Sequence, residues 1–367
     1  MQKKEKGYKK SFEREINSKI RCKLQKIVKM DSKIISFLTQ HYSQEAADSV
    51  QLLSGGGSSR KYYRFFDQNH SYILAESSNI EENKTFFYYT EILNKILPNV
   101  PKIWQISEDF TLYTQTDLGD KTLMNVLEND FEEAKRYYFD SIKLLIKAQI
   151  EAGKEIDFNQ AFSYPKLDKT LILRDLFQFK FYFLNVIGID FNQGKLIKDF
   201  DLFASQFDQL SPKGFVFRDF QSRNIMVKNN EPYFIDYQGG LYGPLFYDLV
   251  ALIWQAKANL STEFKNDLYN FYLQELQELD NTIVPIDCKV SYEYCVVARL
   301  IQVLGTYGLR GIIERKSHFI ESISFGLENL KAIIDYPILQ NYPELKHIIT
   351  VLIQPETIKK INNKING

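Results

Sequence analysis

Residues 215–228 read FVFRDFQSRNIMVK, and residues 231–240 read EPYFIDYQGG. In the first stretch, Asp219 follows a short apolar entry, and Asn224 comes directly before the apolar run IMV. In the second stretch, the strand-like residues YFI lead into Asp236, which is followed by a glycine pair. Apolar runs around a short polar break are typical of strands joined by a tight loop. The pattern therefore predicts a strand, a loop and a strand, with Asp219 and Asn224 at the two ends of the loop.

These three polar residues are suited to phosphoryl transfer. An Asp in such a loop can accept a hydroxyl proton, while an Asn and a second Asp can bind the Mg²⁺ that bridges nucleotide phosphates. An Asp, four residues, an Asn, and a second Asp twelve residues later reproduce the spacing of kinase catalytic and metal-binding loops. The alternative is that all three are turn residues of an ordinary hairpin. Turn residues do not usually lie against runs such as IMV and YFI, so we favour the catalytic interpretation.

The remaining sequence predicts an α+β chain with two domains, since 367 residues exceed one small core. A helical pattern over 32–49 precedes LLSGGGSSRKYYRFF and SYILAES, which predict a hairpin entered through three glycines. EENKTFFYYTEILNKI predicts one inserted helix, and VPKIWQIS and FTLYTQT predict two more strands. Long helical patterns follow. We predict a small sheet domain over 31–116, a large helical domain over 117–345, and a polar, frayed helix or tail over 346–367.

Composition narrows the class of protein. Lys plus Arg equals Asp plus Glu at 46 each, so no net charge attracts nucleic acid or a membrane surface. No stretch approaches eighteen uninterrupted apolar residues, since even residues 171–188 are interrupted by Arg174, Asp175 and Lys180, so no membrane span is expected. The three cysteines form no CxxC pair and have no clustered histidines beside them. We predict reduced thiols in a cytoplasmic, monomeric protein with no nucleic-acid or membrane partner.

Residues 1–30 form a basic leader with eleven Lys or Arg and three Glu. The segment has no apolar core like that of a signal peptide, and its acidic residues argue against a transit peptide. Two interpretations stay open: a non-catalytic leader, or translation that starts at Met30. In either case, a chain beginning at Met30 is expected to keep its activity, because the helix after Asp31 can be capped by its own side chains.

The chain resembles the aminoglycoside phosphotransferase and choline kinase branch of the protein-kinase-like fold. It is most similar to bacterial kinases that phosphorylate the anomeric hydroxyl of N-acetylmuramate and N-acetylglucosamine. The resemblance spans about residues 50–310 and rests on GGGSSRKYYRF, TDLGDKTL, FRDFQSRNIM and FIDYQGGLYGPLFYDLVAL, and less firmly on LDKTLILRDLFQFKFYF and ARLIQVLGTYG. It implies a bilobal fold and an ATP- and Mg²⁺-dependent sugar kinase with a small-molecule acceptor.

The resemblance also implies roles for individual residues. Asp219 is the expected catalytic base, Asn224 and Asp236 are the expected magnesium ligands, and Asp248 is the expected structural carboxylate of the loop. The acceptor is expected near Asp175, Arg174 and Gln238, although an ordinary surface ion pair is an equal alternative for Asp175. The expected nucleotide-binding residues are the glycine-rich turn with the polar residues after it, and the hinge whose backbone would contact adenine: Gly55, Gly56, Gly57, Ser58, Ser59, Arg60, Thr114, Gln115, Thr116 and Asp117. A flexible loop without a ligand is the alternative for the glycines.

Two departures from the kinase pattern bear on function. Phe217 stands where a loop-bracing His is usual, which removes no reactive group. The strand SYILAES has no phosphate-binding Lys, as in the amino-sugar kinases; Arg60 or Lys61 could substitute. The alternatives are a kinase for another acceptor, such as an aminoglycoside, choline or another sugar, and a nucleotide-binding pseudokinase. Retention of Asp219, Asn224 and Asp236 together argues against the pseudokinase.

Overall fold

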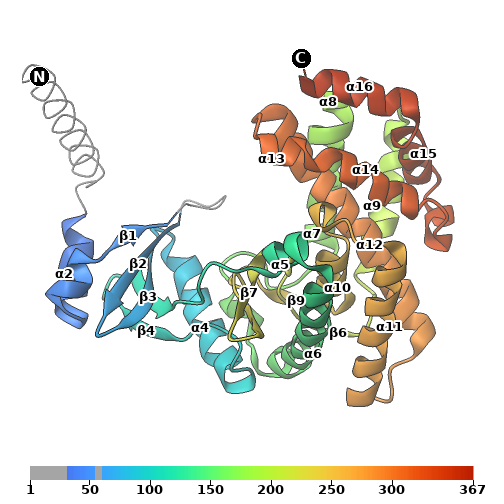
Figure 1. The fold of residues 1–367 in the computed structure, drawn as a ribbon. Coiled ribbons are helices and arrows are strands. Elements are labelled where there is room, and N and C mark those ends of the chain that lie inside the picture. The colour runs from blue at the N-terminus through green and yellow to red at the C-terminus, as the bar shows by residue number, and fades with distance from the viewer. Residues whose placement is uncertain (1–30, 54–59, 367) are drawn as a thin grey trace, which may run out of the picture. The chain divides into compact units, whose positions relative to one another are not determined.

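The computed structural model describes residues 31–53 and 60–366, and the chain divides into two compact units. The sheet unit contains the described residues up to Ser78, together with Trp104–Asp117. The helical unit contains Asn79–Ile103 and the chain from Leu118 onward, so the helix α4 (Ile80–Ile96) groups with it. The expected fold class, an antiparallel sheet followed by a mainly helical part, is confirmed (Figure 1).

The sheet unit is built on five strands in the order β1-β2-β3-β5-β4. They are β1 (Gln51–Leu52), β2 (Lys61–Asp67), β3 (His70–Glu76), β4 (Ile103–Ile106) and β5 (Leu112–Thr116). The pairs β1–β2, β2–β3 and β3–β5 are antiparallel. Gln68 and Asn69 have positive φ angles of 46° and 64°, the backbone that a two-residue hairpin turn requires. The predicted hairpin is therefore present between β2 and β3.

The stretch predicted as a single helix over 32–49 forms two helices, α2 (Ser32–His41) and α3 (Gln44–Asp48). The break has a capping reason, because the Ser43 side chain accepts the Ala46 N–H at 3.1 Å and so starts a new helix. Asp31 caps α2 by accepting the Lys33 N–H at 2.9 Å, as expected. Ile34, Phe37 and Leu38 of α2 pack on the sheet in one core with Tyr63, Phe65, Leu74 and Leu112.

The helical unit contains most of the chain (Figure 1). Its longer helices after α4 are α5 (Leu123–Asn129), α6 (Phe131–Glu155), α7 (Lys169–Gln178), α9 (Gln193–Phe207), α10 (Phe246–Ile253), α11 (Thr262–Leu279), α12 (Pro285–Tyr307), α14 (Ser322–Ala332), α15 (Pro343–Leu352) and α16 (Pro355–Asn366). The tail that was predicted to be frayed forms α16, in which Ile361 is buried.

Two short strand pairs lie among these helices. β6 (Lys213–Val216) pairs with β9 (Leu241–Pro244), and β7 (Ile225–Lys228) pairs with β8 (Glu231–Phe234), both antiparallel. β7 and β8 are joined by Asn229 and Asn230, whose φ angles of 52° and 63° suit a tight hairpin. The loop between β6 and β7 carries the predicted catalytic residues.

Helix α12 runs through the core of the helical unit. With its continuation Gly308–Ile313 it is the one described helix that is long and apolar enough to cross a membrane, yet 61% of its most apolar window is buried inside the protein. A Cβ atom at Gly308 would overlap the carbonyl oxygen of Tyr182, so glycine permits the close approach of the π-helical segment Phe179–Leu184. Cys288 and Cys295 are buried, free thiols on the same helix. We interpret α12 as a core helix.

Candidate active site

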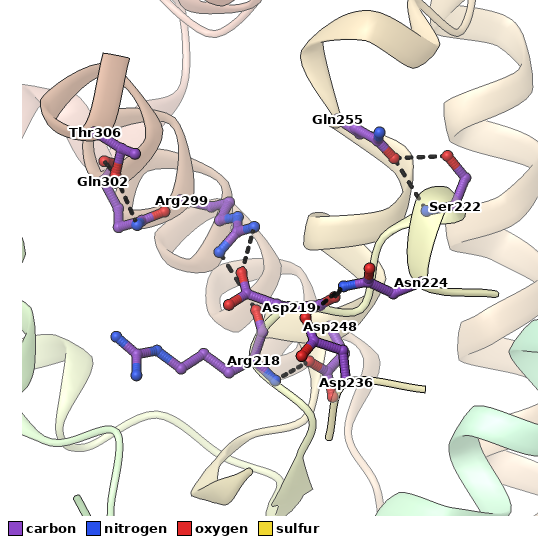
Figure 2. Close-up of polar contacts among 10 residues, drawn as sticks. All are labelled: Arg218, Asp219, Ser222, Asn224, Asp236, Asp248, Gln255, Arg299, Gln302 and Thr306. Atoms are coloured by element: carbon purple, nitrogen blue, oxygen red, sulfur yellow. Dashed lines mark hydrogen bonds and ion pairs between the residues drawn. The ribbon is translucent and has the colours of Figure 1, made fainter. Parts of the chain in front are cut away.

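The loop between β6 and β7 is held at its start by a buried carboxylate. Asp248 of α10 is fully buried and accepts the backbone N–H of Phe217 at 2.7 Å and of Arg218 at 2.9 Å. Figure 2 shows the bond to Arg218. Gln149 donates to the same carboxylate at 3.2 Å. Burial raises the pKa of Asp248 to about 7, although these donors oppose the rise. The two backbone bonds help to hold Arg218 at φ 73°, which a non-glycine residue rarely adopts.

The same loop is held near its far end by Gln255. Its Oε1 accepts both the backbone N–H of Ser222 at 3.0 Å and the Ser222 hydroxyl at 2.7 Å (Figure 2). Gln255 follows α10, so one short stretch of chain, residues 248–255, supplies both anchors. The loop between the anchors contains Asp219, whose position is therefore fixed by side chains of this one stretch.

Asp219 lies between these anchors with a side chain that is 50% exposed. Its backbone oxygen accepts the Asn224 side-chain N–H at 2.9 Å, and its Oδ1 accepts Arg299 Nη2 at 3.2 Å. Burial raises the pKa of the Asp219 carboxyl, but the guanidinium groups of Arg299, Arg218 and Arg223 outweigh it, and the pKa lies below its ordinary value. The carboxylate is ionised at neutral pH, the state that a proton acceptor needs.

Arg299 on α12 is a central residue of this site that the sequence interpretation missed, as it missed Gln255 and Gln302. Its side chain is 5% exposed; Nη2 contacts Asp219, and Nη1 donates to the Arg218 backbone oxygen at 3.3 Å. Its guanidinium also lies 5.7 Å from the centroid of the Tyr247 ring. Burial would lower the pKa of Arg299, but Tyr247 and Asp219 outweigh it, so the guanidinium stays charged. The available signal was one Arg inside the apolar run CVVARLIQVL.

The two predicted magnesium ligands lie side by side. Asn224 Nδ2 is 3.3 Å from Asp236 Oδ2, and Gln238 Nε2 donates to Asp236 Oδ1 at 2.8 Å. Asp236 has a φ angle of 65°, another unusual backbone conformation beside the loop. Amide and carboxylate oxygens are the hard ligands that Mg²⁺ prefers. The described residues contain no group of three or more His, Cys, Asp or Glu that could hold a metal ion. A pair of protein ligands fits Mg²⁺, which commonly completes its shell with waters and substrate phosphates.

A cavity of about 240 Å³ opens on Asp219. Helix α12 supplies Arg299, Gln302, Val303, Thr306 and Tyr307 to its wall. The other lining residues come from the loop, from α10 and the segment after it, and from α5, α13 (Ser317–Ile320) and α14: Met124, Glu128, Gln221, Arg223, Ala251, Trp254, Gln255, Ala256, Lys257, His318, Phe319 and Ser322. Both polar and aromatic side chains are present, as in sites that bind small polar molecules.

Not all predicted site residues meet at this loop. Asp175 of α7 is buried and pairs with its neighbour Arg174 at 2.5 Å, and neither residue lines the cavity. The alternative of a surface ion pair with another helix does not hold, because the Asp175 side chain is only 5% exposed and its partner is on its own helix. Burial raises the pKa of Asp175, although Arg174 opposes the rise. The acceptor-binding role of Arg174 and Asp175 stays a prediction.

The predicted nucleotide-binding residues belong to the sheet unit. Gly55, Gly56, Gly57, Ser58 and Ser59 lie outside the described residues. Arg60 is buried directly before β2. Thr114, Gln115 and Thr116 end β5, and the Asp117 side chain is paired with Arg64 at 2.7 Å. Their nucleotide-binding role stays a prediction.

The fold and the strand–loop–strand geometry define the class as a protein-kinase-like phosphotransferase. The model of the phosphotransferase enzyme family matches residues 49–281, more than half of the chain. The chain belongs to this family. It is accordingly an enzyme, a kinase that transfers phosphate to a hydroxyl acceptor.

Sequence relatives carry a more specific name. The chain is 26% identical over 267 residues to an N-acetylmuramate/N-acetylglucosamine kinase of Neisseria meningitidis, covering 70% of this chain and 75% of the relative. It is 25% identical to a kinase of the same name from Pseudomonas putida, covering 60% of this chain and 63% of the relative, which is less than two thirds of that protein.

Solved structures support the fold alone. An ADP-bound aminoglycoside phosphotransferase matches with a TM-score of 0.54 and 14% identity, covering 82% of this chain and 98% of that one. A Plasmodium vivax ethanolamine kinase matches with a TM-score of 0.53 and 16% identity, covering 83% and 88%. At these identities, the likeness says nothing about the acceptor of this chain.

Proposed function

We propose that this chain is an ATP-dependent sugar kinase that phosphorylates the anomeric hydroxyl of N-acetylmuramate or N-acetylglucosamine. The observation that carries the proposal is the arrangement at the loop. Asp219 presents a carboxylate to a cavity, and Asn224 and Asp236 lie beside each other within contact distance of the same loop. The names of the Neisseria and Pseudomonas relatives support the choice of sugar.

Asp219 is suited to accept the proton of the acceptor hydroxyl. Its Oδ1 is engaged by Arg299, while its Oδ2 accepts no hydrogen bond from the described residues. In the proposed reaction, the hydroxyl oxygen forms a bond to the γ-phosphorus, the bond from that phosphorus to the β–γ bridging oxygen breaks, ADP leaves, and the hydroxyl proton passes to Asp219. An anomeric hydroxyl is more acidic than an ordinary alcohol, so a carboxylate is an adequate base.

Asn224 and Asp236 would hold Mg²⁺ through their side-chain oxygens. When bound, the ion supplies positive charge that offsets the negative charge of the nucleotide phosphates. Gln238 bonds to Asp236 Oδ1 and so restrains the rotation of that carboxylate. The use of ATP is supported by the ADP found in a structural neighbour and by the phosphotransferase family.

The size of the cavity favours a monosaccharide over an aminoglycoside. Its volume of about 240 Å³ lies below the ~300–1,000 Å³ typical of pockets for drug-sized ligands. One sugar ring suits that volume better than the several linked rings of an aminoglycoside. Choline, which offers no ring hydroxyls, would leave the polar side chains of the wall without partners.

The test is ATP consumption with N-acetylmuramate, N-acetylglucosamine, glucose, an aminoglycoside, choline and ethanolamine. We expect turnover with the N-acetyl sugars and a product without a reducing end, because anomeric phosphorylation blocks it. Asp219→Asn should lower kcat by at least ~100-fold, whereas Asp267→Asn, an exposed Asp on α11, serves as the matched control. Near-full activity of Asp219→Asn would show that another group is the base. Turnover of choline or an aminoglycoside alone would replace the sugar assignment.

A further inference from the structure

Helix α12 presents one polar face to the cavity beside Asp219. Arg299, Gln302 and Thr306 are spaced by three and four residues, so their side chains lie on the same side of the helix. All three line the cavity, and Figure 2 shows them along this face. Arg299 contacts Asp219, and Gln302 begins about 4.5 Å further along the helix axis. One small molecule can therefore contact Asp219 and Gln302 together.

The hydrogen bonds of Gln302 determine which way its amide faces. The Thr306 hydroxyl donates to the Gln302 backbone oxygen at 3.2 Å, so its proton is already used. The Thr306 oxygen then accepts Gln302 Nε2 at 3.3 Å. This bond identifies which end of the Gln302 amide is the nitrogen, so the opposite end is the oxygen Oε1. This oxygen is buried and has no hydrogen-bond partner in the described part of the chain.

The unpaired oxygen stands out from the other polar groups of the wall. Gln255 Oε1 accepts from Ser222, and Lys257 pairs with Glu321 at 3.0 Å. Glu128, Arg223 and His318 are exposed, so water can supply their hydrogen-bond partners. A buried acceptor without a partner costs about 1–3 kcal/mol. Such a group in a native protein calls for a partner from outside the chain, and here the partner must be a hydrogen-bond donor.

We propose that Gln302 is a specificity-determining residue whose Oε1 accepts a hydrogen bond from a donor next to the hydroxyl that is phosphorylated. This inference rests on the proposed function, because it takes the acceptor to be a sugar. In an N-acetyl amino sugar, the acetamido N–H is on the carbon adjacent to the anomeric carbon, so it is a neighbour of the reacting hydroxyl. A site built to bond such a donor rejects analogues that lack it, since its own polar atom stays unpaired.

The test compares sugars that differ at this one position. N-acetylglucosamine has an N–H donor on the second carbon, glucose has an O–H, and 2-deoxyglucose has neither. Wild-type enzyme should show kcat/KM values that fall in this order. Gln302→Leu should lower kcat/KM for N-acetylglucosamine by about 10- to 100-fold and change that for 2-deoxyglucose by less than about twofold. A sugar turned over too slowly is measured by its competitive inhibition constant.

Two further variants make the result specific. Gln302→Glu keeps an acceptor oxygen and should retain much of the preference for the N-acetyl sugar, and Gln302→Met is a second test should the Leu variant not fold. Gln274→Leu, at an exposed glutamine of α11, is the matched control and should behave as wild type.

The outcomes separate this inference from the proposed function. An active wild-type enzyme whose preference survives in Gln302→Leu and Gln302→Met would overturn the role of Gln302 alone. An equal loss on all three sugars, with an unchanged melting temperature, would also overturn it. A wild-type enzyme that phosphorylates none of the sugars would overturn the proposed function and this inference with it. A preference that collapses in Gln302→Leu and Gln302→Met, but survives in Gln302→Glu and in Gln274→Leu, would support both.

Discussion

The two units of the chain each contain an Arg paired with an Asp, and the two pairs are built differently. In the sheet unit, Arg64 donates through Nε at 2.7 Å and Nη2 at 3.1 Å to the two oxygens of Asp117, whose side chain is 5% exposed. In the helical unit, Arg299 donates to one oxygen of Asp219, whose side chain is 50% exposed. A bidentate pair engages both carboxylate oxygens, which suits a structural role. A pair that engages one oxygen leaves the other for a substrate. We call Arg64–Asp117 the closed pair and Arg299–Asp219 the open pair.

The largest effect is expected beside the open pair, at the proposed metal ligands. Asp236 supplies a formal charge and Asn224 only a dipole, so Asp236→Ala should lower kcat by at least ~100-fold at any Mg²⁺ concentration, and Asn224→Ala should mainly raise the Mg²⁺ requirement. A titration of turnover against Mg²⁺ measures both, with Asp267→Ala as the control. Equal and small effects of the two changes would remove Asn224 and Asp236 from the metal site.

The open pair itself gives the next effect. Arg299→Met removes the contact that orients Asp219 and should lower kcat by about 10- to 100-fold, with a smaller change in the KM for ATP. Arg299→Lys keeps the charge but offers no planar fork, so it should recover only part of the loss. Steady-state kinetics of both variants provide the measurement. If Arg299→Met altered only the melting temperature, the open and closed pairs would have the same role.

Loss of the closed pair should lower the stability of the sheet unit rather than kcat. Arg64→Met leaves the buried Asp117 carboxylate without its bidentate partner and should destabilise the sheet unit by about 3 kcal/mol. Urea unfolding of Arg64→Met and wild type gives the change in the free energy of unfolding. The double variant Arg64→Met, Asp117→Asn should recover part of the stability, because it also removes the buried negative charge. A stability equal to that of wild type in Arg64→Met would show that the pair contributes no structural stability.

A third kind of buried charge has no acidic partner among the described residues. Lys265 is 8% exposed, donates to Asn329 at 3.2 Å and lies 4.2 Å from the centroid of the Trp254 ring. Burial lowers its pKa from 10.5 to about 8. Between these two values the unfolded chain binds more protons than the folded chain, so stability contributed by this residue rises as the pH increases from 8 to 10.

Lys265→Met should remove that rise. Relative to the Met variant, wild type should gain on the order of 2–3 kcal/mol between pH 7 and pH 10. Urea unfolding at several pH values measures the difference, in which the titrations of all other groups largely cancel. A difference that does not change with pH would show that Lys265 keeps its ordinary pKa and is effectively solvated.

The sequence predicted local patterns better than pairings across the chain. The loop from Phe217 to Asn224 could be located because apolar runs flank its polar residues, and the β2–β3 hairpin because a polar break separates two strand-like runs. Arg299 lies about eighty positions beyond Asp219, and nothing in its surroundings but an apolar helix marks it. Gln302 could not be singled out at all, because its unpaired oxygen is a property of packing. The break between α2 and α3 was missed because Ser43 was not recognised as a cap.

The smallest effect is expected at Lys61 and Glu76, an exposed charge pair of the sheet unit. Lys61 Nζ lies 3.2 Å from Glu76, with side chains 57% and 26% exposed, and the Tyr63 hydroxyl also donates to Glu76 at 2.8 Å. Such a pair contributes about 0.2–1 kcal/mol, so the coupling free energy from a double-mutant cycle of Lys61→Met and Glu76→Gln should fall in that range.

The same variants test whether Lys61 replaces the phosphate-binding lysine absent from β3. A solvated lysine that only pairs with Glu76 predicts an unchanged KM for ATP in Lys61→Met, and the exposure of Lys61 favours this result. A KM that rises about tenfold or more, with the stability still within 1 kcal/mol of wild type, would instead assign Lys61 to the nucleotide and make this exposed pair, like the open pair at Asp219, a part of the reaction.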